Sequence, residues 1–189
     1  MQTSLMIVDN FYNNPMGVRN LALSKDFAVQ GNYPGFRTEP EDTTEVKMYT
    51  ENLIKDTAGK ITDWDSSGYN GAFQYTTAQM RSWIHCDYTT KWAMVIYLTP
   101  DAPLSAGTGL FRHNPTGMYS KPDNDSDMAT RIEADGQDIT KWTLHTVAGN
   151  VFNRAVIYRG DFYHMSMDYF GNCLENGRLF QTFFFNTEQ

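Results

Sequence analysis

The alternation of hydrophobic and polar positions changes character about a third of the way along the chain. Before residue 70, apolar residues recur at spacings of three and four, which predicts amphipathic helices. From about Gly71 onward they form short runs separated by turn residues, which predicts β-strands. We therefore expect a helical N-terminal part, about residues 1–70, and a β core, about residues 71–189.

Few elements are expected in the N-terminal part. Leu5–Val8 is typical of a short strand. A helix begins at Pro15, since the first helical turn tolerates a residue without an N–H, and runs to about Lys25. Tyr33–Phe36 forms a turn. A second helix is expected from about Thr43 to Ala58, and Gly59 could end it.

The β core contains seven candidate strands, and such a number at short spacing predicts a sandwich, barrel or jelly roll with the helices packed outside. The candidates are Ala72–Thr77, Arg81–Asp87, Trp92–Thr99, Gly109–His113, Trp142–Val147, Ala155–Tyr158 and Leu179–Phe185. Residues 114–140 are rich in Asp, Asn, Gly, Ser and Pro. This stretch is too long for a hairpin loop, so it is either a functional loop or partly disordered.

Composition narrows the class of protein. With 189 residues, 41% hydrophobic and 14% aromatic, the chain can bury one core, and we expect one domain, 1–189. No run approaches the roughly 18 apolar residues that span a membrane. The N-terminus has no basic segment followed by a long apolar one, which favours the cytoplasm over secretion.

Charge and cysteine content argue against three further classes of protein. The net charge is −7 and the basic residues are scattered, which argues against nucleic-acid binding, because phosphate contacts need clustered Lys and Arg. Cys86 and Cys173 are too few for a disulfide framework or a thiolate-rich zinc site.

The segment containing His85, Cys86 and Asp87 carries the first chemical signal. In a strand, residues two apart share a face, so His85 and Asp87 could bind one ion while Cys86 faces away. By itself this tripeptide is weak evidence, since a strand histidine hydrogen-bonded to the aspartate explains it more simply.

Three further residues shift the balance toward a metal site. His164 follows the predicted strand Ala155–Tyr158 and could supply a second imidazole; two imidazoles and one carboxylate are typical of non-haem Fe(II) oxygenases. Arg178 opens an apolar strand, where a cation suits an anionic ligand, unless it pairs with a surface acid such as Glu175. Tyr97 places a hydroxyl in another apolar strand.

These residues occur in a familiar order. His85-x-Asp87, the strand ending at Tyr97, Gly107–Phe111, His164 and Gly177–Arg178 together resemble the 2-oxoglutarate/Fe(II) oxygenase superfamily. The likeness is strongest to its prolyl-hydroxylase-like branch and covers about residues 72–187. The N-terminal part resembles small uncharacterised members, some from phage and marine microbial genomes.

The resemblance implies a double-stranded β-helix (a jelly roll) in which His85, Asp87 and His164 bind Fe(II). 2-Oxoglutarate would chelate the iron, with Arg178 binding its distal carboxylate and Tyr97 adding a hydrogen bond. O2 would then be used to hydroxylate an unidentified small molecule or peptide. In much of the branch a Ser or Thr lies two residues after the Arg, whereas this chain has Phe180, and Thr182 could substitute for it.

The remaining candidate residues divide into two groups. Arg81, Trp83 and Asn153 could line the pocket. The others are interpreted as structural: His113, His145, Cys86 and the core aromatics Phe183–Phe185. A non-catalytic jelly-roll binding or structural module with a vestigial metal pocket is the alternative function, because a fold alone does not establish an activity.

Overall fold

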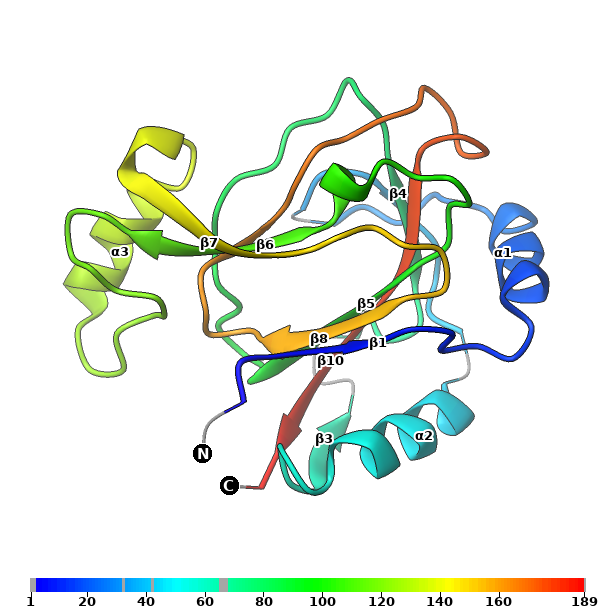
Figure 1. The fold of residues 1–189 in the computed structure, drawn as a ribbon, viewed down its shortest axis with the longest axis horizontal. Coiled ribbons are helices and arrows are strands. Elements are labelled where there is room, and N and C mark those ends of the chain that lie inside the picture. The colour runs from blue at the N-terminus through cyan, green and yellow to red at the C-terminus, as the bar shows by residue number, and fades with distance from the viewer. Residues whose placement is uncertain (1–2, 32, 42, 65–67, 189) are drawn as a thin grey trace.

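The structure, a computed structural model, describes residues 3–31, 33–41, 43–64 and 68–188. Residues 1–2, 32, 42, 65–67 and 189 lie outside the described part, so the predicted parts 1–70 and 71–189 are compared only within it. There the chain is mainly β, with three α-helices and antiparallel sheets. Two of the three helices lie before residue 70, as do three short strands, and the other seven strands of the described residues lie after it (Figure 1).

Within the described ranges, seven strands form a large antiparallel sheet with β10 at its centre. Its order is β1 (Leu5–Val8), β8 (Ala155–Arg159), β5 (Trp92–Tyr97), β10 (Arg178–Thr187), β4 (Phe73–Thr76) and β2 (Phe36–Arg37), with β3 (Ile61–Trp64) also paired to β10. A smaller sheet contains β7 (Trp142–Ala148), β6 (Thr108–His113) and β9 (His164–Ser166).

The two faces of the large sheet have different roles, and the alternation along β5 shows how. Every residue of β5 is buried. Met94 and Ile96 belong to the apolar core that also contains residues of α1 and α2, whereas Ala93, Val95 and Tyr97 pack in a second cluster with Leu110 of the small sheet. Since successive strand residues point to opposite faces, one face carries the helices and the other faces the small sheet.

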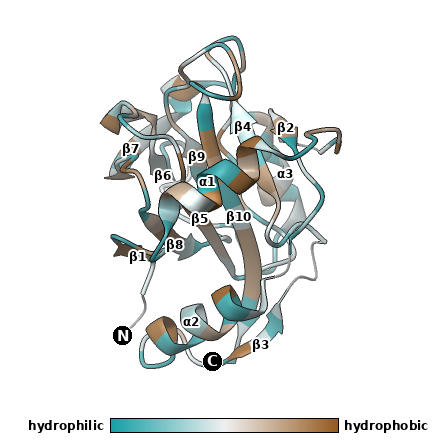
Figure 2. Cartoon of the chain, turned by 90° about the vertical axis from the view of Figure 1, so that its right-hand side faces the viewer, coloured by the Kyte–Doolittle hydropathy of each residue, from teal (hydrophilic) through white to brown (hydrophobic). Residues whose placement is uncertain are grey.

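Two helices lie in the N-terminal part, and a side-chain cap starts the first of them. Asn14 caps α1 (Pro15–Leu23), because its side-chain oxygen accepts a hydrogen bond from the N–H of Gly17 at 3.0 Å. Helix α2 (Thr44–Ile54) buries Thr50 and Ile54, lies below the large sheet (Figure 2) and is shorter than predicted. None of the helices in the described ranges is long and apolar enough to cross a membrane.

The predicted strand Arg81–Asp87 is wrong. The segment forms only an isolated bridge between His85 and His164, with hydrogen bonds of 3.0 and 2.8 Å between their backbones. Within the same segment, the N–H groups of Ile84 and Asp87 donate to the carbonyls of Gly136 and Gly160 instead. Backbone hydrogen bonds to three different segments therefore keep this part of the chain extended, and it does not pair along its length with one strand. The periodicity also does not indicate β2, β3 and β9, which are too short to show one.

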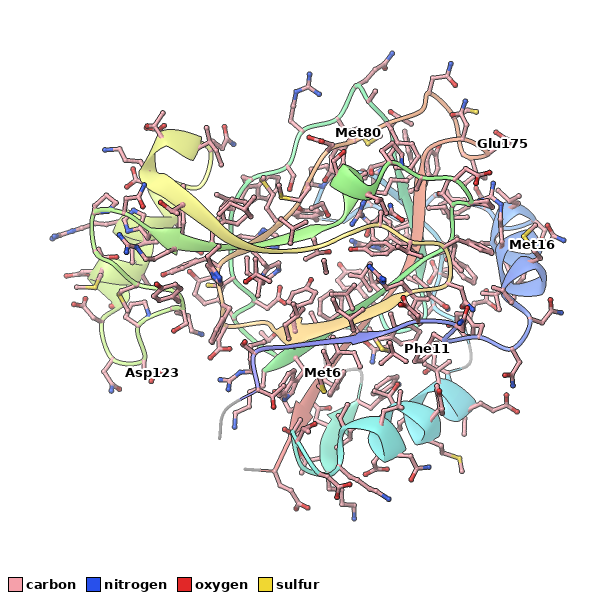
Figure 3. The ribbon with its side chains drawn as sticks, in the orientation of Figure 1. Met6, Phe11, Met16, Met80, Asp123 and Glu175 are labelled. Atoms are coloured by element: carbon pink, nitrogen blue, oxygen red, sulfur yellow. The ribbon has the colours of Figure 1, made fainter. Side chains whose placement is uncertain are left out.

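The irregular loop expected at residues 114–140 contains a helix, α3 (Ser126–Ala134), and a short 3-10 turn, η2 (Ile139–Lys141). Asp125 caps α3, its side-chain oxygen accepting from the N–H of Met128 at 2.8 Å. Fully buried Ile132 anchors it in a cluster with Phe111 and Trp142. The excursion projects from the sheets, and Asp123 lies at its outer end (Figures 1 and 3). The surrounding residues are mostly polar, so the composition of this stretch did not indicate that Ile132 would be buried.

We expect Ile132→Ala to lower the free energy of unfolding by about 2–5 kcal/mol, because truncating a fully buried isoleucine leaves a cavity. Urea unfolding followed by tryptophan fluorescence would measure it. Ile139→Ala is the matched control: that side chain is 56% exposed, so its loss should change stability by no more than about 0.5 kcal/mol. Equal, small effects of the two substitutions would contradict the packing of α3.

Candidate metal centre

His85, Asp87 and His164 meet at one place although they come from distant parts of the chain. His164 opens β9, which lies between β6 and the extended segment that carries the other two residues. Asp87 is fixed by its N–H, which donates to the carbonyl of Gly160 at 2.7 Å. A Cβ at Gly160 would come within 2.9 Å of the Asp87 carboxylate, so the close approach requires glycine there.

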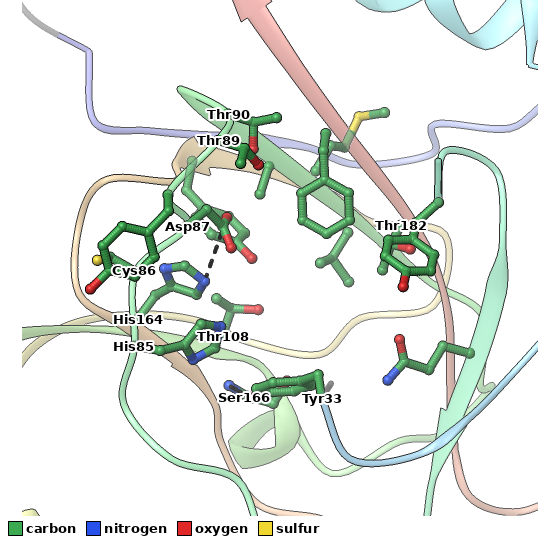
Figure 4. Close-up of a pocket in the computed structure, with 18 of the residues that line it drawn as sticks. Tyr33, His85, Cys86, Asp87, Thr89, Thr90, Thr108, His164, Ser166 and Thr182 are labelled. Carbon is green, nitrogen blue, oxygen red and sulfur yellow. Dashed lines mark hydrogen bonds and ion pairs between the residues drawn. The ribbon is translucent and has the colours of Figure 1, made fainter. Parts of the chain in front are cut away.

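The three side chains form a compact cluster (Figure 4). One ligand atom from each lies within 4.8 Å of the others. Nε2 of His164 is 3.9 Å from Oδ2 of Asp87, and the two imidazole rings are 4.4 Å apart between centroids. This spacing leaves room for one ion between the three groups.

Backbone carbonyls fix both imidazoles. Nδ1 of His85 lies 3.1 Å from the carbonyl of Trp83, and Nδ1 of His164 lies 2.8 Å from that of Phe162. Because a carbonyl only accepts, each Nδ1 carries the proton and donates it. Each Nε2 therefore keeps its lone pair, as in metal-binding histidines that donate their other N–H to a backbone oxygen.

Burial sets the charge state of the cluster. Desolvation lowers the pKa of His85 and of His164 to about 4, so both imidazoles are neutral near pH 7. Desolvation raises the pKa of Asp87 to about 6, and its buried Oδ2 has no hydrogen-bond partner among the described residues. Two neutral imidazoles and an unpaired carboxylate oxygen suit a divalent transition metal, so the residues fit such an ion.

We expect acid to weaken metal binding here through the carboxyl group. As the pH falls, Asp87 gains a proton near pH 6, before either histidine near pH 4. The affinity for Mn(II) should be constant above about pH 7 and fall roughly tenfold per unit below about pH 6. Calorimetric titrations between pH 5 and 8 would measure this. Release of two protons per ion already at pH 7 would instead show competition at the imidazoles.

The cluster opens into a cavity of about 490 Å³ between the two sheets. In Figure 4 the three residues lie at one end and Thr182 of β10 lies opposite. Much of the wall is aromatic, and the aromatic lining residues are Tyr33, Tyr69, Trp83, Tyr88, Tyr158, Phe180 and Phe184. Cavities of this size bind small organic molecules.

Arg178 and Tyr97 lie together one layer behind this wall. Arg178 is fully buried; Nε and Nη2 donate to the carbonyls of Ala106 and Gly107 at 2.9 and 3.3 Å. Its Nη1 has no hydrogen-bond partner among the described residues. The guanidinium lies 5.2 Å from the Tyr97 ring centroid, and burial raises the pKa of Tyr97. The buried position excludes the alternative of pairing with the exposed Glu175.

Two lining residues separate this pair from the cavity. The Phe180 ring stacks on the Arg178 guanidinium at 4.5 Å, and Thr108 shares a 2.7 Å hydrogen bond with the Tyr97 hydroxyl. Thr182, the predicted substitute for the missing Ser or Thr, lines the cavity, and its buried hydroxyl has no partner among the described residues.

The next four candidate residues lie at different places, and one of them lines the cavity. Trp83 lines the cavity, but Arg81 is exposed and borders a separate hollow. The expectation for Asn153 is wrong: its side chain bonds to the backbone of Tyr12 and does not line the cavity. His113 hydrogen-bonds Thr116 and Asp135, away from the cluster.

The last candidates concern packing. Exposed His145 also lies outside the cluster. Cys86 is buried and its pKa is raised to about 12 by desolvation, so it remains a thiol. Within the run Phe183–Phe185, the first and last residues belong to the core, as predicted, but Phe184 lines the cavity.

Sequence reasoning missed the wall that comes from the N-terminal part. The Tyr33 ring lies against that of His85 at a tilt of 44°, with ring centroids 4.8 Å apart, and Arg37 also lines the cavity; Gln74, from β4 in the β core, is a third lining residue that was missed. Tyr33 sits in a turn and Arg37 in a two-residue strand, so no periodicity pointed to either. For Gln74, the sequence offered one indication of a role in the cavity, namely a polar residue inside an apolar strand.

Comparison with solved structures identifies the same kind of fold in oxygenases. HygX from Streptomyces hygroscopicus, solved with nickel and 2-oxoglutarate bound, has a TM-score of 0.65 at 10% identity, covering 98% of this chain and 84% of HygX. A Trichoplax adhaerens prolyl hydroxylase in complex with a hypoxia inducible factor peptide gives 0.55 at 12%, covering 96% and 83%. A Pseudomonas putida prolyl-4-hydroxylase gives 0.51 at 14%, covering 98% and 94%.

Sequence comparison identifies a family whose description names no activity. No curated protein sequence matches this chain significantly. The profile of one family, described as "Family of unknown function (DUF6445)", matches residues 1–185, nearly the whole chain. The chain therefore belongs to the DUF6445 family, and its fold is that of 2-oxoglutarate-dependent oxygenases.

Proposed function

We propose that this protein is a non-haem Fe(II) oxygenase that couples oxidative decarboxylation of 2-oxoglutarate to hydroxylation of a small-molecule or peptide substrate. The observation that carries the proposal is the His85–Asp87–His164 cluster at one end of the cavity between the two sheets. We infer that the two sheets form a jelly roll, as the fold of the structural neighbours supports.

The metal would be held by the Nε2 atoms of His85 and His164 and by the carboxylate of Asp87. These are three ligands, so positions for a cosubstrate and O2 remain open, as in other two-histidine, one-carboxylate sites. Bound Fe(II) supplies the redox chemistry that joins O2 to the decarboxylation. The orphaned Oδ2 of Asp87 is the main support for an ion here, since a buried carboxylate without a partner is costly.

2-Oxoglutarate would lie with its distal carboxylate toward Arg178 and Tyr97. Arg178 is fully buried, has an unused Nη1 donor and pairs with no carboxylate in the described part of the chain. A buried guanidinium of this kind suits a carboxylate. The Phe180 ring stacks on the Arg178 guanidinium, so the ring must shift before a carboxylate can contact Arg178 directly. Phe180 occupies the position at which related enzymes have a Ser or Thr.

The chain's own residues would prepare the site for this reaction. The carbonyls of Trp83 and Phe162 orient the two imidazoles, and Gly160 admits the Asp87 carboxylate. The aromatic part of the wall lowers the polarity around the cluster, which strengthens the electrostatic interactions inside the cavity.

The decisive test is metal-dependent binding and turnover of 2-oxoglutarate. We expect the protein loaded with Mn(II) to bind 2-oxoglutarate in anaerobic calorimetry and the metal-free protein to bind it at least tenfold more weakly. With Fe(II) and O2 it should release succinate and CO2 in equal amounts. Metal binding without any 2-oxoglutarate binding would favour the alternative, a non-catalytic jelly-roll module.

A further inference from the structure

A second buried cation, Arg37, lies in the wall of the cavity and has no role in the proposed metal and cosubstrate sites. Its side chain comes from edge strand β2 and is 8% exposed. Among the described residues that line the cavity, it is the sole lysine or arginine. An arginine keeps its charge at any pH the protein meets, so a permanent positive charge faces this space.

The surroundings of Arg37 position the guanidinium without neutralising it. Nε and Nη2 both donate to Oε1 of Gln74, at 3.3 and 2.9 Å, and the Gln74 amide nitrogen donates to the carbonyl of Pro34 at 2.8 Å. The guanidinium also lies 4.4 Å above the centre of the Tyr69 ring. No carboxylate in the described part of the chain pairs with it.

Burying the Arg37 guanidinium in these surroundings costs free energy unless an anion binds to it. Desolvation lowers the pKa of Arg37, which reflects the loss of water around its charge. A buried charge is normally compensated by a partner of opposite sign, and a neutral amide with a ring face compensates only part of it. The guanidinium geometry matches a carboxylate, which it can bind through two hydrogen bonds.

Arg37 and Arg178 lie at different places: Arg37 lines the cavity, whereas Arg178 lies behind its wall. Along the large sheet, Arg37 pairs with Gln74, Gln74 with Phe180, and Phe180 with Tyr97. Two strand spacings, roughly 10 Å, therefore separate Arg37 from β10. Arg178 turns toward Ala106 and Gly107 next to the small sheet, whereas Arg37 is held at the β2 edge by Gln74 and Tyr69.

We propose that Arg37 binds a carboxylate of the substrate that is oxidised. The class of substrate is an organic acid with an apolar or aromatic body, because Tyr33, Trp83 and Phe184 line the same cavity as Arg37 and the metal cluster. This assignment rests on the proposed function for the identity of the reacting end. The anion site itself consists of residues that need no metal.

The site can be tested in metal-free protein with phenylacetate and its neutral isostere phenylacetamide as probes. We expect phenylacetate to bind at least tenfold more tightly in calorimetry or ligand-detected NMR, because a charge-assisted bond is made by the acid alone. Arg37→Gln should reduce phenylacetate to the affinity of the amide. Arg37→Lys should keep an intermediate preference, since an ammonium retains charge without the paired donors.

Matched controls separate this site from unspecific charge effects and from the cosubstrate site. Arg131→Gln removes an exposed arginine of α3 and should leave probe binding unchanged. Circular dichroism checks each variant, and if Arg37→Gln does not fold, the wild-type preference together with Arg37→Lys decides. Equal binding of acid and amide, or a preference lost in Arg178→Lys and kept in Arg37→Gln, would overturn the proposal.

A second arm titrates 2-oxoglutarate into Mn(II)-loaded protein. Arg37→Gln should bind it within about twofold of wild type. A loss in this variant with full binding in Arg178→Lys would make Arg37 the cosubstrate residue and overturn the proposal. If wild type itself binds no 2-oxoglutarate, the proposed function fails, and the metal-free measurement still decides the carboxylate site.

Discussion

Asp87→Asn is expected to weaken Mn(II) binding at least a hundredfold and to abolish 2-oxoglutarate turnover, with the fold intact. The carboxylate is the one anionic group of the cluster, and substitutions merely behind such ligands already cost 10- to 100-fold in metal affinity. The metal-free variant should be at least as stable as wild type, because the buried Oδ2 has no partner in the described part of the chain. Calorimetry and thermal unfolding measure the two effects.

His85→Ala and His164→Ala should also abolish turnover, since each removes one of three ligands. Asp123→Asn is the control for loss of an acidic residue, because Asp123 is exposed at the far end of the α3 excursion. A variant of any of the three ligands with full metal-dependent activity would show that the metal centre is wrongly assigned.

The second large effect is expected at Arg178. Arg178→Ala should weaken 2-oxoglutarate binding to the Mn(II)-loaded protein by roughly 30- to 1000-fold, the range for a buried, charge-assisted contact, and leave Mn(II) binding nearly unchanged. Arg178→Lys should recover part of the loss. Tyr97→Phe removes a single hydroxyl, so its loss should not exceed about 1.5–3 kcal/mol. Titration of 2-oxoglutarate into each variant tests this order.

Stability must be measured alongside, because Arg178 also has a structural role. Its Nε and Nη2 bond the carbonyls of Ala106 and Gly107, and these would lose their donors in Arg178→Ala. A destabilised variant with wild-type cosubstrate affinity would show that this structural role is its whole contribution. The cosubstrate assignment would then fall, and the metal centre would stand.

The sequence alone was sufficient for features that depend on local pattern. The apolar runs of β5 and β10 predicted strands at nearly their observed bounds, and Pro15 marked the start of α1. The order of His85, Asp87 and His164, together with Tyr97 and Arg178, also indicated a metal centre, because two imidazoles and one carboxylate are typical of non-haem Fe(II) oxygenases. These inferences needed only residue type and spacing.

The tertiary structure decided what depends on distant segments. His85 and Asp87 lie close together not because a strand runs there but because backbone hydrogen bonds to His164 and Gly160 hold that segment extended. Likewise, α3 is fixed by Ile132 in a cluster with Phe111, to which the surrounding polar sequence gave no clue.

Arg37 shows the same limit most clearly. In the sequence it is an ordinary arginine after a turn; in the fold, pairing of β2 with β4 buries its charge beside Gln74 and within the cavity wall. Burial and long-range pairing set the energy of a charged group, and neither is encoded by its neighbours in the chain. The sequence therefore determined which chemistry is available, and the packing of the sheets determined where each group acts.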